Sequence, residues 1–189
     1  MRVIGGQYRS RRLESLPGMD LRPTADRLRE TLFDILTAGN PSALQGTVWL
    51  DLYAGTGAVG IEALSRGASS VYFVDSSKRA TDLIRKNLGS LKDEAGGHIL
   101  NETVERSLRD LAAAGTEASF VFFDPPYRLE AEYEKTLSAL SGSTLLKASS
   151  VVIAEHHKNF DPGDSFGSLR RFRVLKQGDA ALSFYRRDS

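Results

Sequence analysis

The residues with the clearest chemical meaning are the run Asp124-Pro125-Pro126-Tyr127. They follow the apolar segment 120–123, which is typical of a buried strand in a parallel sheet. Because proline has no N–H to give to a sheet, the strand must end there in a stiff corner. Ligands of open α/β sheets bind beyond the carboxyl ends of the strands. A carboxylate, a proline carbonyl and an aromatic ring at this corner predict a grip on a planar base with an exocyclic amine.

The chemistry that this corner predicts is methylation of that amine. Base amines are poor nucleophiles because the ring delocalises the nitrogen lone pair. If the Asp124 carboxylate and the Pro125 carbonyl each accept one amine hydrogen, the nitrogen is drawn toward tetrahedral geometry. Tyr127 would stack on the base, which contributes about 1–3 kcal/mol in single-strand binders, and in-line positioning would supply the remaining rate. An ordinary strand-ending turn is the alternative interpretation.

A glycine-rich loop upstream could hold the methyl donor. Its three glycines match the dinucleotide fingerprint, so a nicotinamide or flavin enzyme is an alternative. The loop and the helix after it favour a negative ligand group, either a pyrophosphate or an amino-acid carboxylate. Asp51 favours the second, because it would repel a pyrophosphate but accept hydrogen bonds from the ammonium of S-adenosylmethionine; it could instead only hold the loop. The cofactor-binding residues predicted here are Asp51, Tyr53, Ala54, Gly55, Thr56, Gly57 and Gly60.

A second acid, Asp75, ends the apolar segment 71–74. An acid at this strand end is placed to accept the ribose hydroxyls of an adenosine, and hydrogen bonds to a charged acceptor contribute about 1.5–3 kcal/mol. NAD would use the same acid, so Asp75 and the adjacent Ser76 predict a nucleoside without selecting the cofactor. Capping of the helix that begins near Ser77 is the alternative role.

The scaffold that must position these residues is predicted to be a parallel α/β sheet. Residues 169–176 and 180–187 flank a Gly178-Asp179 turn and predict an antiparallel hairpin, whereas 157–168 predict a loop. A mostly parallel sheet finished by a hairpin resembles the Rossmann-like, seven-stranded fold of class I methyltransferases. The expected strands are 47–52, 70–75, 98–103, 119–124 and 149–155, and the expected helices are 59–66, 77–89, 105–114 and 130–141.

The N-terminal residues predict a small extension, 1–23, in front of a methyltransferase domain at 24–189. Residues 2–13 predict a basic hairpin, and Thr24 is the expected N-cap of the helix that follows. Arg9, Arg11 and Arg12 are the predicted RNA-binding residues, because a guanidinium can pair bidentately with phosphate. A solvated surface is the alternative for these arginines.

Composition excludes several classes of protein. A hydrophobic content of 41% and a charged content of 26% are typical of a soluble globular protein, and the net charge of +1 selects no partner. The absence of cysteine excludes disulfides, thiolate zinc sites and cysteine nucleophiles. No segment resembles a signal peptide or a membrane span, so a cytoplasmic protein is expected. Glu155, His156 and His157 predict surface residues rather than a metal site, because adjacent histidines on a strand face opposite ways.

Three parts of the chain resemble the RsmD family, whose members methylate the 2-amino group of a guanine in bacterial 16S ribosomal RNA. They are 51–60 with 62–68, the run 124–127, and an N-terminal part made of 2–6, 11–13 and 21–33. The N-terminal part is the most discriminating, because many amino-methyltransferases share the other two. The resemblance implies S-adenosylmethionine as cofactor and 16S rRNA in the assembling 30S subunit as partner, with no membrane and no metal. We also expect a monomer.

The same resemblance extends to two further places. It implies that the loop with Arg22 and Thr24 folds over the cofactor and the flipped base; a plain helix cap is the alternative. After the third strand, Thr103 and Val104 occupy the place of the family's Asp-Ala, so the adenine amine would meet backbone, Thr103 or Glu102. The competing functions are another base amino-methyltransferase, acting on DNA adenine or a different RNA, a nicotinamide-dependent oxidoreductase, and a catalytically silent RNA-binding module.

Overall fold

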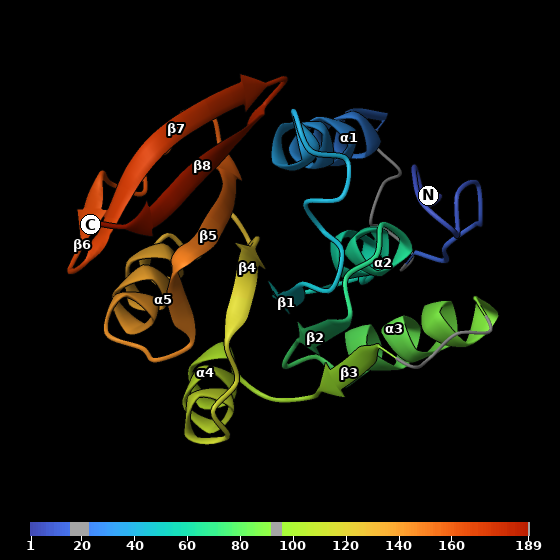
Figure 1. Ribbon diagram of the computed structural model, residues 1–189, viewed down its shortest axis with the longest axis horizontal. Coiled ribbons are helices and arrows are strands. Elements are labelled where there is room, and N and C mark those ends of the chain that lie inside the picture. The colour runs from blue at the N-terminus through green and yellow to red at the C-terminus, as the bar shows by residue number, and fades with distance from the viewer. Residues whose placement is uncertain (16–22, 92–95, 189) are drawn as a thin grey trace.

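An eight-stranded sheet with helices on both faces forms the centre of the molecule in the computed structural model, which describes residues 1–15, 23–91 and 96–188 (Figure 1). The strand order is β3-β2-β1-β4-β5-β8-β7-β6. β1 to β5 run parallel, and β8, β7 and β6 add to β5 in antiparallel pairs. The strands are β1 (Val48–Leu52), β2 (Ser70–Val74), β3 (Gly97–Leu100), β4 (Ala118–Phe123), β5 (Leu146–His157), β6 (Ser165–Phe166), β7 (Leu169–Gln177) and β8 (Ala180–Arg187).

The helices divide into two layers, and each layer buries an apolar stripe against the sheet. Residues of α1, α2 and α3 share one core cluster with the facing side chains of the strands, and residues of α4 and α5 share a second cluster on the other face. Figure 1 shows the two layers on opposite sides of the sheet. The helices are α1 (Pro23–Thr37), α2 (Ala58–Ser65), α3 (Lys78–Ser90), α4 (Val104–Ala113) and α5 (Ala131–Ser141).

The predicted fold is confirmed, and β4 lies beside β1 in the sheet. The structure differs from the prediction in one added strand, because β6 lies within the predicted loop 157–168. β6 is two residues long and pairs only with the start of β7, so it leaves no alternating pattern in the sequence. In the part of the chain that the structure describes, no helix is long and apolar enough to cross a membrane.

The N-terminal residues 1–15, here called the N-terminal block, fold back on themselves more loosely than predicted. A single antiparallel bridge, Arg2 with Arg12, replaces the expected pair of strands. The block is nevertheless fixed to the domain, because Val3 and Leu13 are buried in the core cluster of α1, α2 and α3. Two backbone N–H groups of the N-terminal block also donate hydrogen bonds to the buried Glu62 carboxylate on α2, at 2.7 and 2.8 Å.

The start of α1 corrects the prediction for Thr24. The helix begins at Pro23, so Thr24 lies inside the first turn and is not the N-cap. Proline fits the first helical position because that N–H has no partner within the helix. Arg22 lies outside the described residues, so its predicted role stays a prediction.

Candidate active site

Four carboxylates lie at the carboxyl edge of the parallel strands. Asp51 lies among the last residues of β1, and Glu155 among the last residues of β5. Asp75 directly follows β2, and Asp124 directly follows β4. Leu52 pairs with both Val74 and Phe123, and Phe123 pairs with Ala154. The register therefore places Asp75, Asp124 and Glu155 at one height, and Asp51 two residues earlier along β1. The sheet therefore gathers the predicted cofactor acids and the predicted acceptor corner at one edge.

Asp51 holds the glycine loop and carries a poorly compensated charge. Its carboxylate accepts the Gly60 N–H at 2.8 Å, and the residue is only 2% exposed. Burial, with smaller effects from the nearby Asp124 and Asp75, raises the pKa of Asp51 to about 8 against the lowering effect of the Gly60 bond. The loop-holding role is therefore present in the structure, and a cation beside Asp51 would stabilise its ionised form.

Asp75 connects the end of β2 to the glycine loop. Its carboxylate accepts the Gly55 N–H at 3.0 Å and the Ser77 N–H at 2.8 Å. Each carboxylate oxygen keeps further lone-pair capacity, so ribose hydroxyls can still be accepted. The sequence analysis missed Asn101, whose amide donates at 3.1 Å to the carbonyls of both Asp75 and Ser76 and ties the end of β3 to this turn.

The glycines of the loop are required by backbone geometry and by close packing. Gly55 and Gly57 have φ values of 56° and 75°, which favour glycine strongly. A Cβ on Gly60 would come within 2.3 Å of the Phe73 ring, so only glycine lets α2 approach the sheet this closely. The loop therefore presents its backbone at the start of α2.

The other predicted loop residues have different surroundings. The Tyr53 side chain points to α5, where its hydroxyl donates to Glu132 at 2.9 Å, so it does not face the loop. The Ala54 N–H bonds to the Val74 carbonyl at 3.0 Å. Thr56 is buried, and its carbonyl accepts from the Asn87 side chain at 3.0 Å. These residues can offer a ligand backbone atoms more readily than side chains.

Asn87 is a second residue that the sequence analysis missed. Its amide is buried on α3 and also bonds to both the N–H and the carbonyl of Glu14, at 2.8 and 3.1 Å. The same side chain therefore joins the glycine loop to the end of the N-terminal block. A lone asparagine in a helix gives no signal of this role in the sequence.

The acceptor corner combines a partly buried acid with an exposed ring. Burial raises the pKa of Asp124 to about 7. Pro125 is buried and Pro126 is exposed, while Tyr127 is 42% exposed and meets the His157 ring edge-on, with ring centres 5.7 Å apart. The ring of Tyr127 is thus accessible to a base at the mouth of the site.

The prediction that residues 155–157 form a surface is wrong for His156. This side chain is 2% exposed, and its Nε2 lies 2.9 Å from the Ser183 hydroxyl. Burial lowers the pKa of His156. Glu155 lies beside Asp124, because Phe123 pairs with Ala154. Burial and the neighbouring Asp124 raise the pKa of Glu155 well above the usual value, with Arg29 acting in the opposite direction.

In the segment after β3, only some of the groups predicted to contact the adenine amine remain available. Thr103 is the N-cap of α4 and accepts the Arg106 N–H at 3.4 Å, while Val104 is buried in the second core cluster. The Glu102 carboxylate is already held by the Ser107 hydroxyl at 2.9 Å and by Arg106 at 3.1 Å. The exposed Thr103 and the backbone around it are the groups left to meet an adenine.

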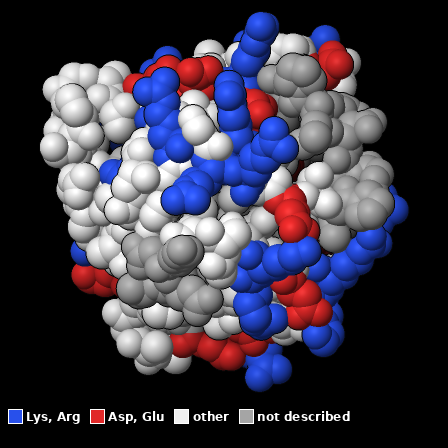
Figure 2. Space-filling view, turned by 90° about the vertical axis from the view of Figure 1, so that its right-hand side faces the viewer, with Lys and Arg blue, Asp and Glu red and all other residues white. Residues whose placement is uncertain are grey.

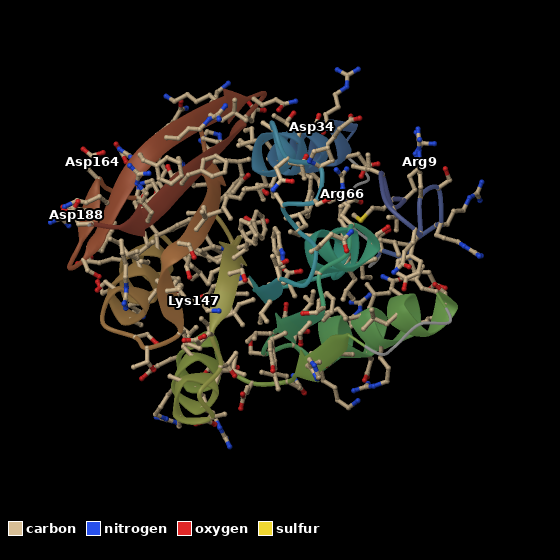
Figure 3. All side chains as sticks on the ribbon, viewed as in Figure 1. Arg9, Asp34, Arg66, Lys147, Asp164 and Asp188 are labelled. Carbon is tan, nitrogen blue, oxygen red and sulfur yellow. The ribbon has the colours of Figure 1, made fainter. Side chains whose placement is uncertain are left out.

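The predicted RNA-binding arginines lie on the outside of the N-terminal block. Arg9, Arg11 and Arg12 are exposed, and none forms an ion pair with another described residue. Figure 2 shows basic side chains gathered on the face of the molecule that carries this block, and Figure 3 shows Arg9 pointing away from the sheet. These charges remain available to an external anion.

Comparison with known proteins agrees with this geometry. A family model described as "Conserved hypothetical protein 95" matches residues 1–186. The putative rRNA methyltransferase YlbH of Bacillus subtilis (strain 168) is 32% identical over 189 residues, which cover 99% of each chain. Ribosomal RNA small subunit methyltransferase D of Escherichia coli (strain K12) is 32% identical over 191 residues, covering 100% of this chain and 91% of that protein. The solved structure of the putative methyltransferase yhhF from Escherichia coli superposes with a TM-score of 0.82 at 30% identity, covering 100% of this chain and 98% of that one.

Proposed function

The chain belongs to the family of conserved hypothetical protein 95, the RsmD family, and from this premise we propose that it methylates the 2-amino group of one guanine in 16S ribosomal RNA. Within that family it is an S-adenosylmethionine-dependent rRNA methyltransferase. The observation that carries the choice of a base amine is the Asp124–Tyr127 corner at the same sheet edge as Asp51 and the glycine loop.

The residues present fit S-adenosylmethionine better than a dinucleotide. A pyrophosphate at the start of α2 would lie among the carboxylates of Asp51, Asp75 and Asp124. The negative charges of Asp75 and Asp124 already raise the pKa of Asp51. The ammonium of S-adenosylmethionine would instead relieve that repulsion. We assign the ammonium to Asp51, the ribose hydroxyls to Asp75, and the amino-acid carboxylate to the backbone N–H groups of the loop.

The corner residues prepare the acceptor amine. When bound, the cofactor supplies a methyl group on a positively charged sulfur. The Asp124 carboxylate and the Pro125 carbonyl each accept one hydrogen of the amine, so its lone pair is freed and directed at the methyl carbon. Tyr127 stacks on the base and fixes its plane. As the new N–C bond forms, the nitrogen becomes acidic, and Asp124, whose pKa is raised to about 7, can receive the released proton.

We assign RNA recognition outside the active site to the exposed Arg9, Arg11 and Arg12. They belong to residues 1–23, which we propose as an extension to the methyltransferase domain 24–189. The guanidinium groups of Arg9, Arg11 and Arg12 form no ion pair with another described residue, so they suit a phosphate backbone. A guanine flipped out of its stack can reach the carboxyl edge of the sheet. We further propose that the substrate is the assembling 30S subunit in the cytoplasm, and that the enzyme acts as a monomer.

Nucleoside mapping tests the proposed function. Small subunits from a strain that lacks the modification are incubated with the enzyme and tritiated S-adenosylmethionine, and the 16S rRNA is digested and analysed. We expect label in N2-methylguanosine at one position. Label in methyladenosine, or label only in DNA, would replace the proposed substrate by another base amine.

A further inference from the structure

The group at the acceptor corner that this mechanism leaves unused is the Glu155 carboxylate. β4 and β5 are parallel neighbours, and Phe123 pairs with Ala154 at the end of their register. The next residues on the two strands are Asp124 and Glu155. Because neighbouring strands run about 4.8 Å apart, both carboxylates can contact one planar base.

The two side chains leave the sheet on the same face. Side chains alternate along a strand, so Asp124 shares a face with Phe122, and Glu155 shares a face with Ile153. Phe122 and Ile153 both belong to the core cluster of α1, α2 and α3. Asp51 bonds to the N-terminus of α2 in that layer, so Glu155 points to the side of the sheet where the methyl donor is proposed to bind.

Neither carboxylate accepts a hydrogen bond from the part of the chain that the structure describes. Among residues 1–15, 23–91 and 96–188, no group donates a hydrogen bond to the Asp124 or Glu155 side chain. The backbone of Glu155 is held in place, because the Tyr133 hydroxyl donates to its carbonyl at 2.8 Å. Arg29 acts on Glu155 as a positive charge, but its hydrogen bonds go to the Arg2 carbonyl and to Asp26. The described residues therefore give the pair no N–H donors, and a ligand can bring them.

We propose that Glu155 accepts the N1–H of the target guanine while Asp124 accepts a hydrogen of the 2-amino group, so that the two carboxylates together select guanine. This inference rests on the proposed function. Guanine carries neighbouring N–H donors at N1 and N2, which match two neighbouring acceptors. Adenine carries a lone pair at N1, next to its 6-amino group, and an ionised Glu155 repels it.

The test changes the base only at N1 and C6. 2-Aminopurine keeps the 2-amino group but has a lone pair at N1 in place of the N–H. Small subunits are reconstituted with 16S rRNA that carries guanine or 2-aminopurine at the mapped position, and methyl transfer is measured as kcat/KM. We expect the unmodified enzyme to prefer guanine by about 100-fold or more, since a site built for a donor rejects an analogue that lacks it. Equal rates on the two RNAs would overturn the inference without any variant.

Two variants then test whether the preference for guanine over 2-aminopurine depends on Glu155. Glu155→Gln can donate its amide N–H to N1 of 2-aminopurine, so we expect the preference for guanine to fall by about tenfold or more, partly through faster reaction of 2-aminopurine. Glu130→Gln makes the same change at an exposed glutamate that precedes α5 and should keep the preference of the unmodified enzyme.

The outcomes separate the inference from the proposed function. Glu155→Gln that binds S-adenosylhomocysteine normally but slows both RNAs by one common factor would make Glu155 a structural residue and overturn the inference. Failure of the unmodified enzyme to methylate guanine-containing subunits would overturn the proposed function instead.

Discussion

Asp124 has a role at the residue scale that can be separated from cofactor binding. Its carboxylate is placed to accept an amine hydrogen of the substrate, and no group of the cofactor is assigned to it. For Asp124→Asn we expect single-turnover methyl transfer to fall by about 10²–10³-fold, the loss typical for one group that acts in the transition state. The affinity for S-adenosylhomocysteine, measured by titration calorimetry, should change by less than a few-fold. A matching loss of cofactor affinity would mean that Asp124 belongs to the cofactor pocket.

Asp51 gives a prediction for the pH dependence of stability. Its pKa rises from 3.8 to about 8 on folding. The folded protein therefore holds a proton that the unfolded chain releases, so the Asp51 carboxyl lowers the free energy of unfolding as pH rises from about 4 to 8. Asp51→Asn can still accept the Gly60 N–H. We expect the ligand-free variant to be more stable than the unmodified protein at pH 8 and the difference to shrink toward pH 4, as measured by urea unfolding.

The same variant should lose affinity for the cofactor. A neutral amide accepts from an ammonium more weakly than a carboxylate, so we expect about tenfold or more weaker binding of S-adenosylhomocysteine at pH 8. Glu105→Gln, a change at an exposed glutamate on α4, serves as the control. Unchanged affinity in Asp51→Asn would limit Asp51 to holding the loop.

At the scale of elements, the approach of α2 to the sheet depends on Gly60. Gly60→Ala places a Cβ 2.3 Å from the Phe73 ring and 2.7 Å from Val71, so overpacking should lower the free energy of unfolding by about 1–3 kcal/mol. Gly142→Ala is the matched control, because nothing lies within 4 Å of its Cβ position and its φ is −93°. Equal stability of the two variants would contradict the close packing of α2 on the sheet.

Most elements could be predicted from the sequence because their signals are local. Apolar runs and helix caps place β1, β2, β4 and α2 to α5 within about two residues of their observed bounds. β6 was missed because a strand of two residues is too short to show an alternating apolar pattern. The start of β5 was missed because Lys147 to Ser149 are exposed and give no apolar signal.

The site could be predicted only where its functional residues form a short contiguous motif in the sequence. The Asp124–Tyr127 run and the glycine loop are such cases. Glu155 and Asn87 were missed because their roles come from neighbours distant in sequence, Asp124 across a strand pair and Glu14 across a helix. The register of β4 with β5 is the information that the sequence analysis lacked. In the pairing of these two strands, Glu155 follows the last paired residue of β5 as Asp124 follows that of β4, and the residues around Glu155 in the sequence do not indicate this pairing.

At the scale of the whole molecule, charge is distributed so that one face can meet RNA. Replacing Arg9, Arg11 and Arg12 by glutamine should weaken binding of 16S rRNA and reduce the slope of log K against log salt by about 2–3, because three phosphate contacts are lost. Filter binding over a range of salt concentrations measures this slope. The control triple, Arg106, Arg109 and Lys147, is exposed around the other helical layer, and Figure 3 shows Lys147 far from Arg9. An unchanged slope in the first triple would make the N-terminal block an ordinary solvated surface.

The central claim is that the corner after β4 holds a guanine amine against the cofactor. The measurement that tests it most directly is a structure of the enzyme with S-adenosylhomocysteine and its RNA substrate. We predict the guanine 2-amino nitrogen within about 3 Å of both the Asp124 carboxylate and the Pro125 carbonyl, with Tyr127 stacked on the base. A guanine bound elsewhere, or a different base at Asp124, would contradict the account.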